Sequence, residues 1–287
     1  TQLIHPDIKE CIRRVQSIDR RLWERTIQYS DFLAARIGMG KMPLRLNIKA
    51  PEQRISIETD NLMLEPQKLA EEFAYINNIP VSMPLFQMGT CGYIGIRQEV
   101  LKNLRSLVIQ LATHHSYEEV KIIAVYSPEE ESEWEWMRWL PHVWDDSRQM
   151  RFMAKDKESV HDLFSMFYDI IKEREFRAGD KEKHINTIQL PHFVFLLGDI
   201  RLLENEAIMT YLAHNCQHLG VSSVFLFDRM EFLPKDCHVI LDFNSKTAEM
   251  IERANETIKS EFTPDKVSIK DSDLFARRMA PIRMKQM

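Results

Sequence analysis

Nearly continuous apolar runs, separated by amphipathic stretches, dominate the chain from residue 93 onward. The runs cover residues 93–96, 121–126, 193–198, 221–227 and 238–243. Runs without polar alternation are typical of strands covered on both faces, as in a parallel sheet between two layers of helices. Helical spacing of apolar residues predicts helices at 97–113, 157–177 and 204–219. The pattern therefore predicts an α/β fold with a mostly parallel sheet flanked by helices.

The first forty residues have an apolar residue at every third or fourth position. This spacing predicts a helix over residues 3–37, which Gly38 and Gly40 would end. We therefore divide the chain into a helical stalk or linker segment, residues 1–40, and a domain, residues 41–287. Arginines on this helix would form either a solvated, salt-bridged face or a contact with acidic lipid or a neighbouring chain: Arg13, Arg14, Arg20, Arg21 and Arg25.

Shorter patterns complete the expected elements. Strands are expected at Leu44–Ile48, Ile55–Glu58 and Val81–Phe86. Helices are expected at Pro66–Ile76 and at residues 246–259.

Composition narrows the class of protein. Apolar residues make up 44% of the chain and the net charge is −5, so a sizeable core is expected and a global basic footprint for nucleic acid is absent. The 4 cysteines are scattered without a CxxC motif, as in a reduced cytosolic protein, and no metal site is expected. No apolar run is long enough to span a membrane. Because the first residue is Thr1, we expect an excised piece of a longer protein, whose membrane anchor could lie outside it.

The segment GYIGIRQEVLKNLRSLVIQLA, residues 92–112, has the strand and helix of a phosphate-binding unit without its loop. A P-loop, GxxxxGK[ST], wraps phosphates with backbone N–H groups and neutralises them with lysine. Counting from Gly95, the glycine, lysine and hydroxyl positions hold Val100, Leu101 and Lys102. Counting from Gly92 also fails, because Arg97, Gln98 and Glu99 occupy them. The segment is either an ordinary turn or a phosphate seat that has lost its chemistry.

Ligands of such sheets bind at the carboxyl ends of the strands, which here follow Ile96 and Tyr126 and lie at Asp199 and Asp228. Asp199 ends the run PHFVFLLGD and is followed by Ile200, where an ATPase would carry a catalytic glutamate. It is either a cap or turn residue or a metal ligand. The acidic run Glu129–Glu131 is expected to be solvated.

The segment WEWMRWLPHVW, residues 134–144, holds four of the chain's five tryptophans. These residues either anchor a long connection in the core or form a docking surface, because tryptophan and arginine dominate interface energetics. The candidates for interaction are Trp134, Trp136 and Trp139. His114 and His115 are interpreted as a cationic cap on a helix end. No GxSxG, HExxH or GxGxxG motif is present, so no catalytic residue is assigned.

Four segments together resemble the type VII secretion ATPases, the EssC/EccC type of FtsK/SpoIIIE-like protein. They are SIDRRLWERTIQYSDFLAARIGMGKMP, LVIQLATHHSYEEVKIIAVYSPE, WEWMRWLPHVWDD and FTPDKVSIKDSDLFARRMAPIRM. The resemblance keeps its order over nearly the whole chain. It implies a RecA/FtsK-like P-loop ATPase fold, in the form of the membrane-proximal, degenerate ATPase domain of that family.

The resemblance places a degenerate nucleotide site at Gly95, Arg97 and Lys102, with Asp199 at the position of the magnesium-binding aspartate. It implies a parent that is anchored in the membrane, faces the cytoplasm, binds Mg-ATP and forms a hexamer. Partners implied are the other ATPase domains of the parent, other membrane subunits of the secretion system and, through the parent, WXG-type substrates. No cofactor is expected in this domain and no nucleic acid is expected as a partner.

Three functional hypotheses follow. The first is a non-catalytic module for assembly and coupling between the membrane stalk and active ATPase domains. The second is a noncanonical nucleotide-binding domain, in which Arg97 or Lys102 replaces the P-loop lysine and Asp199 holds Mg²⁺. The third is a docking module that contacts other subunits or substrate through the tryptophan-rich segment.

Overall fold

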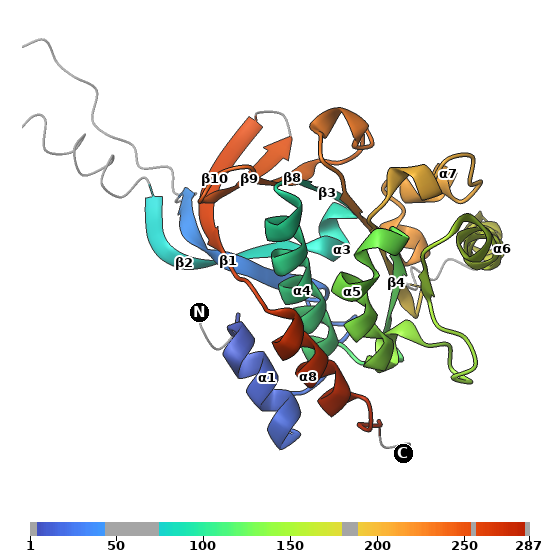
Figure 1. The fold of residues 1–287 in the computed structure, drawn as a ribbon, viewed down its shortest axis with the longest axis horizontal. Helices are drawn as coiled ribbons and strands as arrows, with labels where there is room; N and C mark the ends of the chain where they lie inside the picture. The colour runs from blue at the N-terminus through green and yellow to red at the C-terminus, as the bar shows by residue number, and fades with distance from the viewer. Residues whose placement is uncertain (1–4, 44–74, 180–188, 254–256, 285–287) are drawn as a thin grey trace, which may run out of the picture.

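The computed structural model describes residues 5–43, 75–179, 189–253 and 257–284 (Figure 1). The strands are β1 Ala34–Pro43, β2 Tyr75–Pro84, β3 Thr90–Gly95, β4 Val120–Val125, β5 Met153–Ala154, β6 His192–Leu197, β7 Val221–Leu226, β8 Val239–Phe243, β9 Ala248–Arg253 and β10 Thr257–Pro264. The α-helices are α1 Ile8–Ser17, α3 Leu85–Met88, α4 Arg97–His114, α5 Glu131–Trp134, α6 Lys157–Gly179, α7 Met209–Leu212 and α8 Ile269–Met279.

All ten strands belong to one sheet, in the order β2-β1-β10-β9-β8-β3-β7-β6-β4-β5. The strands from β8 to β5 pair in parallel, whereas those from β2 to β8 form an antiparallel extension. The parallel strands carry the apolar runs of the sequence, and β4, β6 and β7 are buried along their whole length. The predicted α/β fold with a mostly parallel sheet and flanking helices is confirmed.

Helices cover the parallel strands on both faces (Figure 1). On one face, α4 contacts α1 and α8, and its apolar side packs into a cluster that includes Leu104, Tyr93 and Phe275. On the other face, α6 contributes Phe164 and Phe167 to a cluster with the strand residues of β6. This sandwich fixes the carboxyl ends of β3, β4, β6 and β7 on one edge of the sheet.

The antiparallel extension corrects one predicted element. Residues 246–259, expected to be helical, form β9 and the start of β10. In β9 the buried Ala248 and Met250 alternate with the partly exposed Glu249, which is the two-residue period of a strand. The spacing of apolar residues in this segment is compatible with a helix. Pairing with β8 and β10 decides for a strand.

The expected helix over residues 3–37 is also wrong beyond its first turns. Helix α1 ends at Ser17, because Ile18 adopts a left-handed conformation with φ 47°, and β1 begins at Ala34. The boundary placed between residues 40 and 41 therefore falls inside a strand of the sheet. Arg14 is fully buried and forms ion pairs with Glu10 and Glu24, so it is not part of a solvated face.

Other predicted elements differ from the structure or lie outside the residues that it describes. Residues 204–219 contain only α7 and a 3₁₀ turn, Gln217–Leu219, in place of one helix. The strand expected at Val81–Phe86 is the end of β2 followed by α3. Leu44–Ile48, Ile55–Glu58 and most of Pro66–Ile76 lie outside the described residues. Within the described ranges, no helix combines the length and apolar character needed to cross a bilayer.

Four histidines are fully buried in the core: His114, His115, His142 and His192, the last at the start of β6. His115, which is fully buried, accepts a hydrogen bond from the N–H of Leu33 at Nε2 (2.9 Å), and its Nδ1 lies 3.1 Å from the carbonyl oxygen of Leu111. Burial lowers the pKa of His115 and His192 to about 3 and that of His142 to about 4. Burial also lowers the pKa of His114 well below its usual value. The interpretation of His114 and His115 as a cationic cap is therefore wrong.

These histidines predict the direction of the pH dependence of stability. An unfolded histidine binds a proton below about pH 6.5, whereas His192 in the folded chain does so only near pH 3. The buried, neutral His192 therefore contributes fully to the free energy of unfolding above about pH 6.5. This contribution is lost as the pH falls from about 6.5 towards 3. Urea unfolding at pH 7 and pH 5 should show that His192→Gln loses about 1–2 kcal/mol less stability between these pH values than the unmodified chain.

The matched control is His218→Gln, because His218 is exposed. It should keep the pH dependence of the unmodified chain. An unchanged pH dependence in His192→Gln would contradict the burial of a neutral imidazole at this position.

Candidate functional site

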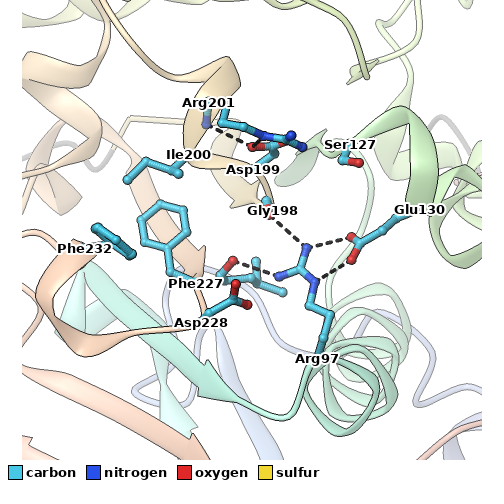
Figure 2. Close-up of a pocket in the computed structure, with 11 residues that line it drawn as sticks. Arg97, Ser127, Glu130, Gly198, Asp199, Ile200, Arg201, Phe227, Asp228 and Phe232 are labelled. Atoms are coloured by element: carbon cyan, nitrogen blue, oxygen red, sulfur yellow. Dashed lines mark hydrogen bonds and ion pairs between the residues drawn. The ribbon is translucent and has the colours of Figure 1, made fainter.

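A cavity of about 450 Å³ opens at the carboxyl edge of the parallel strands (Figure 2). Its lining includes Arg97 after β3, Ser127 after β4, Asp199 after β6 and Asp228 after β7. The four strand ends named from the sequence thus meet around one cavity. This is the position at which open α/β sheets bind their ligands.

The connection from β3 to α4 is too short to wrap a phosphate. Strand β3 ends at Gly95 and α4 begins at Arg97, so Ile96 alone separates them. Gly95 has φ 112°, and a Cβ atom there would lie 2.7 Å from the backbone nitrogen of Asn244. Glycine is therefore needed for the close approach to β8, and no run of free backbone N–H groups precedes the helix.

Arg97 fills the position that the missing loop leaves. Its guanidinium donates to both carboxylate oxygens of Glu130, each at 2.6 Å, and to the carbonyl oxygens of Leu226 and Gly198, each at 2.8 Å. These four bonds engage four of the five N–H donors of an arginine. Figure 2 shows the guanidinium between Gly198 and Glu130, with the side chain rising from the start of α4. Arg97 therefore acts as an internal ion-pair partner.

Asp199 lies in the same cavity and is bonded to a second arginine. Arg201 donates to it through Nη2 (2.7 Å), Nε (3.0 Å) and its backbone N–H (2.9 Å). Burial opposes ionisation of Asp199, but the hydrogen bonds from Arg201 and the nearby charge of Arg97 bring its pKa below the usual value. The carboxylate is ionised and caps the 3₁₀ turn Ile200–Leu202.

The remaining predicted site residues lie elsewhere. Lys102 donates to Glu99 (2.8 Å), which also pairs with Lys266, and these two lysines lower the pKa of Glu99. Neither Lys102 nor Gly95 lines the cavity. Of the four candidates for a nucleotide site, the structure brings together Arg97 and Asp199 only.

Two side chains that line the cavity, Glu130 and Arg201, were not predicted from the sequence. Glu130 belongs to the acidic run that was expected to be solvated, yet it is the carboxylate that holds Arg97. Arg201 was not considered, although it stands two residues after Asp199. The position of Glu130 just beyond β4, at a strand end already singled out, was the one signal that could have found it.

The tryptophan-rich segment forms the wall behind this ion pair. Trp134 is buried, stacks on Tyr126 with ring centroids 5.2 Å apart, and donates from Nε1 to Glu130 (3.3 Å). Gly198 leaves room for it, since a Cβ there would lie 2.9 Å from the Trp134 ring. Trp136 is buried as well, so a partner could not contact either side chain without rearrangement. Trp139 is partly exposed.

The lining offers little that could neutralise phosphate. Within the described part of the chain it contains no lysine, and both of its arginines, Arg97 and Arg201, are bonded to carboxylates. The other walls are apolar, from Ile200, Phe227 and Phe232. The site has the location of a nucleotide site in an ATPase-type α/β fold, but its two arginines are already bonded to Glu130 and Asp199.

Comparison with solved structures supports that fold class. The cytoplasmic domain of the type VII secretion ATPase EccC from Thermomonospora curvata superimposes with a TM-score of 0.63, at 14% identity, over 97% of this chain and 35% of that one. ATPases 2 and 3 of EssC from Geobacillus thermodenitrificans give a TM-score of 0.59, at 12% identity, over 90% of this chain and 50% of that one. The fold is that of FtsK/RecA-like ATPase domains.

Sequence comparison identifies the homologues as EssC/EccC proteins. The ESX secretion system protein EccC of Geobacillus thermodenitrificans is 28% identical over 276 residues, which are 96% of this chain and 18% of that protein. The type VII secretion system protein EssC of Staphylococcus aureus is 27% identical over 278 residues, 96% of this chain and 19% of that protein. No family model matches the chain. The chain thus spans less than a fifth of the length of these relatives, and the type VII secretion ATPase resemblance is confirmed.

The Arg97–Glu130 pair predicts a measurable coupling energy. Both side chains are about three-quarters buried, at 24% and 22% exposure, so removing one leaves a partly buried charge without its partner. We expect Arg97→Ala and Glu130→Ala each to cost about 1–3 kcal/mol in urea unfolding, with the double variant costing much less than the sum.

Lys102→Ala provides the matched control one turn further along α4, because its pair with Glu99 is more exposed. It should cost less than about 0.5 kcal/mol. Additive effects of Arg97→Ala and Glu130→Ala would contradict the direct contact.

Proposed function

We propose that this chain is a non-catalytic, ATPase-like domain of a type VII secretion motor protein, which acts in assembly and in coupling. It would join the membrane-anchored part of the parent to active ATPase domains on the same chain. The observation that carries the proposal is the β3–α4 junction, where a single residue replaces the phosphate loop and Arg97 is bonded to Glu130.

Charge and backbone geometry at the β3–α4 junction both disfavour phosphoryl transfer. Catalysis of phosphoryl transfer depends on groups that cradle and neutralise the phosphates and on a bound Mg²⁺. Here no loop of backbone N–H groups surrounds the phosphate position, and Arg97 at the start of α4 is neutralised by Glu130. Ile200 follows Asp199 at the position where an active ATPase carries a catalytic glutamate. A triphosphate would have to displace an ion pair that is largely shielded from water, at a substantial cost in free energy.

The wider setting is proposed from the relatives. They are described as type VII secretion proteins, and the chain covers less than a fifth of them. We place the domain on the cytoplasmic side of the membrane in a hexameric parent that binds Mg-ATP in its other ATPase domains. Its partners there would be those domains, other membrane subunits and, through the parent, WXG-type substrates.

A noncanonical nucleotide site is the competing function. Its one support is that Arg97, Asp199 and Arg201 share a cavity of about 450 Å³, which is large enough for a ligand. Lys102 gives no support, because it pairs with Glu99 outside the cavity.

Calorimetry with Mg-ATP on the isolated domain separates the two. We expect no binding at micromolar concentrations and no turnover, for the unmodified chain and for Arg97→Ala alike, because the variant still lacks the phosphate loop. Micromolar binding with turnover by the unmodified chain would refute the proposal. If Mg-ATP bound to the Arg97→Ala variant but not to the unmodified chain, the arginine, rather than the missing loop, would be what closes the site.

Secretion by the full-length parent tests the role in assembly. Asp199→Ala should leave secretion within about twofold of normal, because the carboxylate caps a turn and pairs with the exposed Arg201. Leu104→Asp, which buries a charge in the core between α4 and the sheet, should reduce secretion by at least about tenfold. A strong loss in Asp199→Ala, with the parent still assembled and at normal abundance, would instead point to a metal-dependent reaction.

A further inference from the structure

A cluster of arginines and tryptophans lies on a face of the molecule away from the cavity of Figure 2. Its members come from the connection that follows α5 and from α8: Arg138, Trp139, Trp144, Arg148, Arg151 and Arg277. All of them except Arg277 line a recess of about 200 Å³, together with Pro141 and Ala280. We call this surface the Arg–Trp face.

Three of these arginines, Arg138, Arg151 and Arg277, lie over the indole rings. Over Trp139, the guanidinium carbons of Arg277 and Arg138 lie 4.5 Å and 5.1 Å from the ring centroid. Over Trp144, that of Arg151 lies at 4.5 Å, and the indole N–H of Trp144 donates to the carbonyl oxygen of Arg138 (3.0 Å). Arg138 and Arg277 already pair with Glu135 and Asp273. Stacking orders the guanidinium of Arg151 and leaves its N–H edge free for a carboxylate, so binding there would lose little side-chain entropy.

The local charge is opposite to that of the whole chain. The net charge is −5, yet the recess is lined by Arg138, Arg148 and Arg151 and by no carboxylate among the described residues. Arg138 pairs with Glu135 at the margin of the recess. Arg148 and Arg151 are exposed and form no ion pair with any described residue. Two cations without an ion-pair partner among the described residues therefore stand beside the recess, and one of them, Arg151, is stacked on Trp144.

We propose that the Arg–Trp face binds an acidic protein segment that carries one large apolar side chain. The apolar side chain enters the recess between Trp139 and Trp144, and flanking carboxylates pair with Arg148 and Arg151. A recess of about 200 Å³ is smaller than the sites of small-molecule ligands, and it suits a single side chain. Tryptophan and arginine around a recess are also the residues that dominate the binding energy of protein interfaces.

A membrane surface fits these observations less well. Asp146, whose side chain is 90% exposed, lies two residues before Arg148, and Asp145 is close by. Anionic headgroups would be repelled by these carboxylates, whereas a protein segment can place its own acidic residues on the arginines and avoid the aspartates.

The proposal does not rest on the absence of nucleotide chemistry, because the two surfaces share no residue. Either proposal can fail while the other holds.

Fluorescence anisotropy with a labelled Glu/Asp-rich peptide that carries one central Phe provides the test. The chain should bind this peptide with micromolar affinity that weakens as salt is added. Replacing the Phe by Ser should weaken binding by about tenfold, through loss of the buried apolar side chain. The double substitution Arg148→Glu with Arg151→Glu should weaken it by at least about tenfold, since both carboxylate contacts become repulsive.

The matched control is Lys157→Glu with Lys172→Glu, which makes the same change in net charge at exposed positions of α6. It should leave the affinity for the peptide unchanged. The proposal is overturned by no binding of the peptide, by equal binding of the Ser peptide, or by equal weakening in the control variant. Binding to phosphatidylserine vesicles without binding to the peptide would also overturn it, in favour of a lipid surface.

Discussion

The contact between Arg97 and Glu130 fixes the carboxyl edge of the sheet. One guanidinium joins the start of α4 to the ends of β6 and β7 through the carbonyl oxygens of Gly198 and Leu226. The same carboxylate accepts a bond from Trp134, which anchors the connection after β4. Four segments that are distant in sequence thus depend on one ion pair. In a low-dielectric setting such a network is stable only if every member has its partner.

This network supports the proposal that the fold is kept although the chemistry of its usual site is lost. Carbonyl oxygens at the ends of parallel strands need donors, and a bound ligand or its loop can supply them. Here Arg97 supplies them from within the chain. The carbonyl oxygens of Leu226 and Gly198 thus have donors without a ligand, which supports the proposal that the domain is non-catalytic. The tight junction at Gly95 then serves packing between β3 and β8.

The sequence predicts the parallel half of the fold because its strands are apolar on both faces, as the buried runs of β4, β6 and β7 show. It fails at β9, where Ala248 and Met250 face the core only because a neighbouring strand is present. Among the arginines of the first segment, Arg14 misleads for a similar reason, whereas Arg13 and Arg21 form the expected salt-bridged face. Arg14 is buried through ion pairs that a periodicity cannot reveal.

The cavity also contains residues that the sequence could place and residues that it could not. Arg97 and Asp199 could be placed, since each stands at the end of a recognisable strand. Lys102 could not serve beside Arg97, because five residues along a helix rotate a side chain by about 140° and raise it by about 7.5 Å. Glu130 could not be paired with Arg97, since the contact joins residues 33 positions apart. The fold decides which distant charges pair, and a local sequence pattern cannot predict such a pair.

A crystal structure of the domain grown with a millimolar excess of a non-hydrolysable Mg-ATP analogue tests the central claim most directly. The account predicts Arg97 in contact with Glu130, Gly198 and Leu226, and no nucleotide between them. A nucleotide in this cavity, with Arg97 turned away from Glu130 and its phosphates at the start of α4, would contradict it.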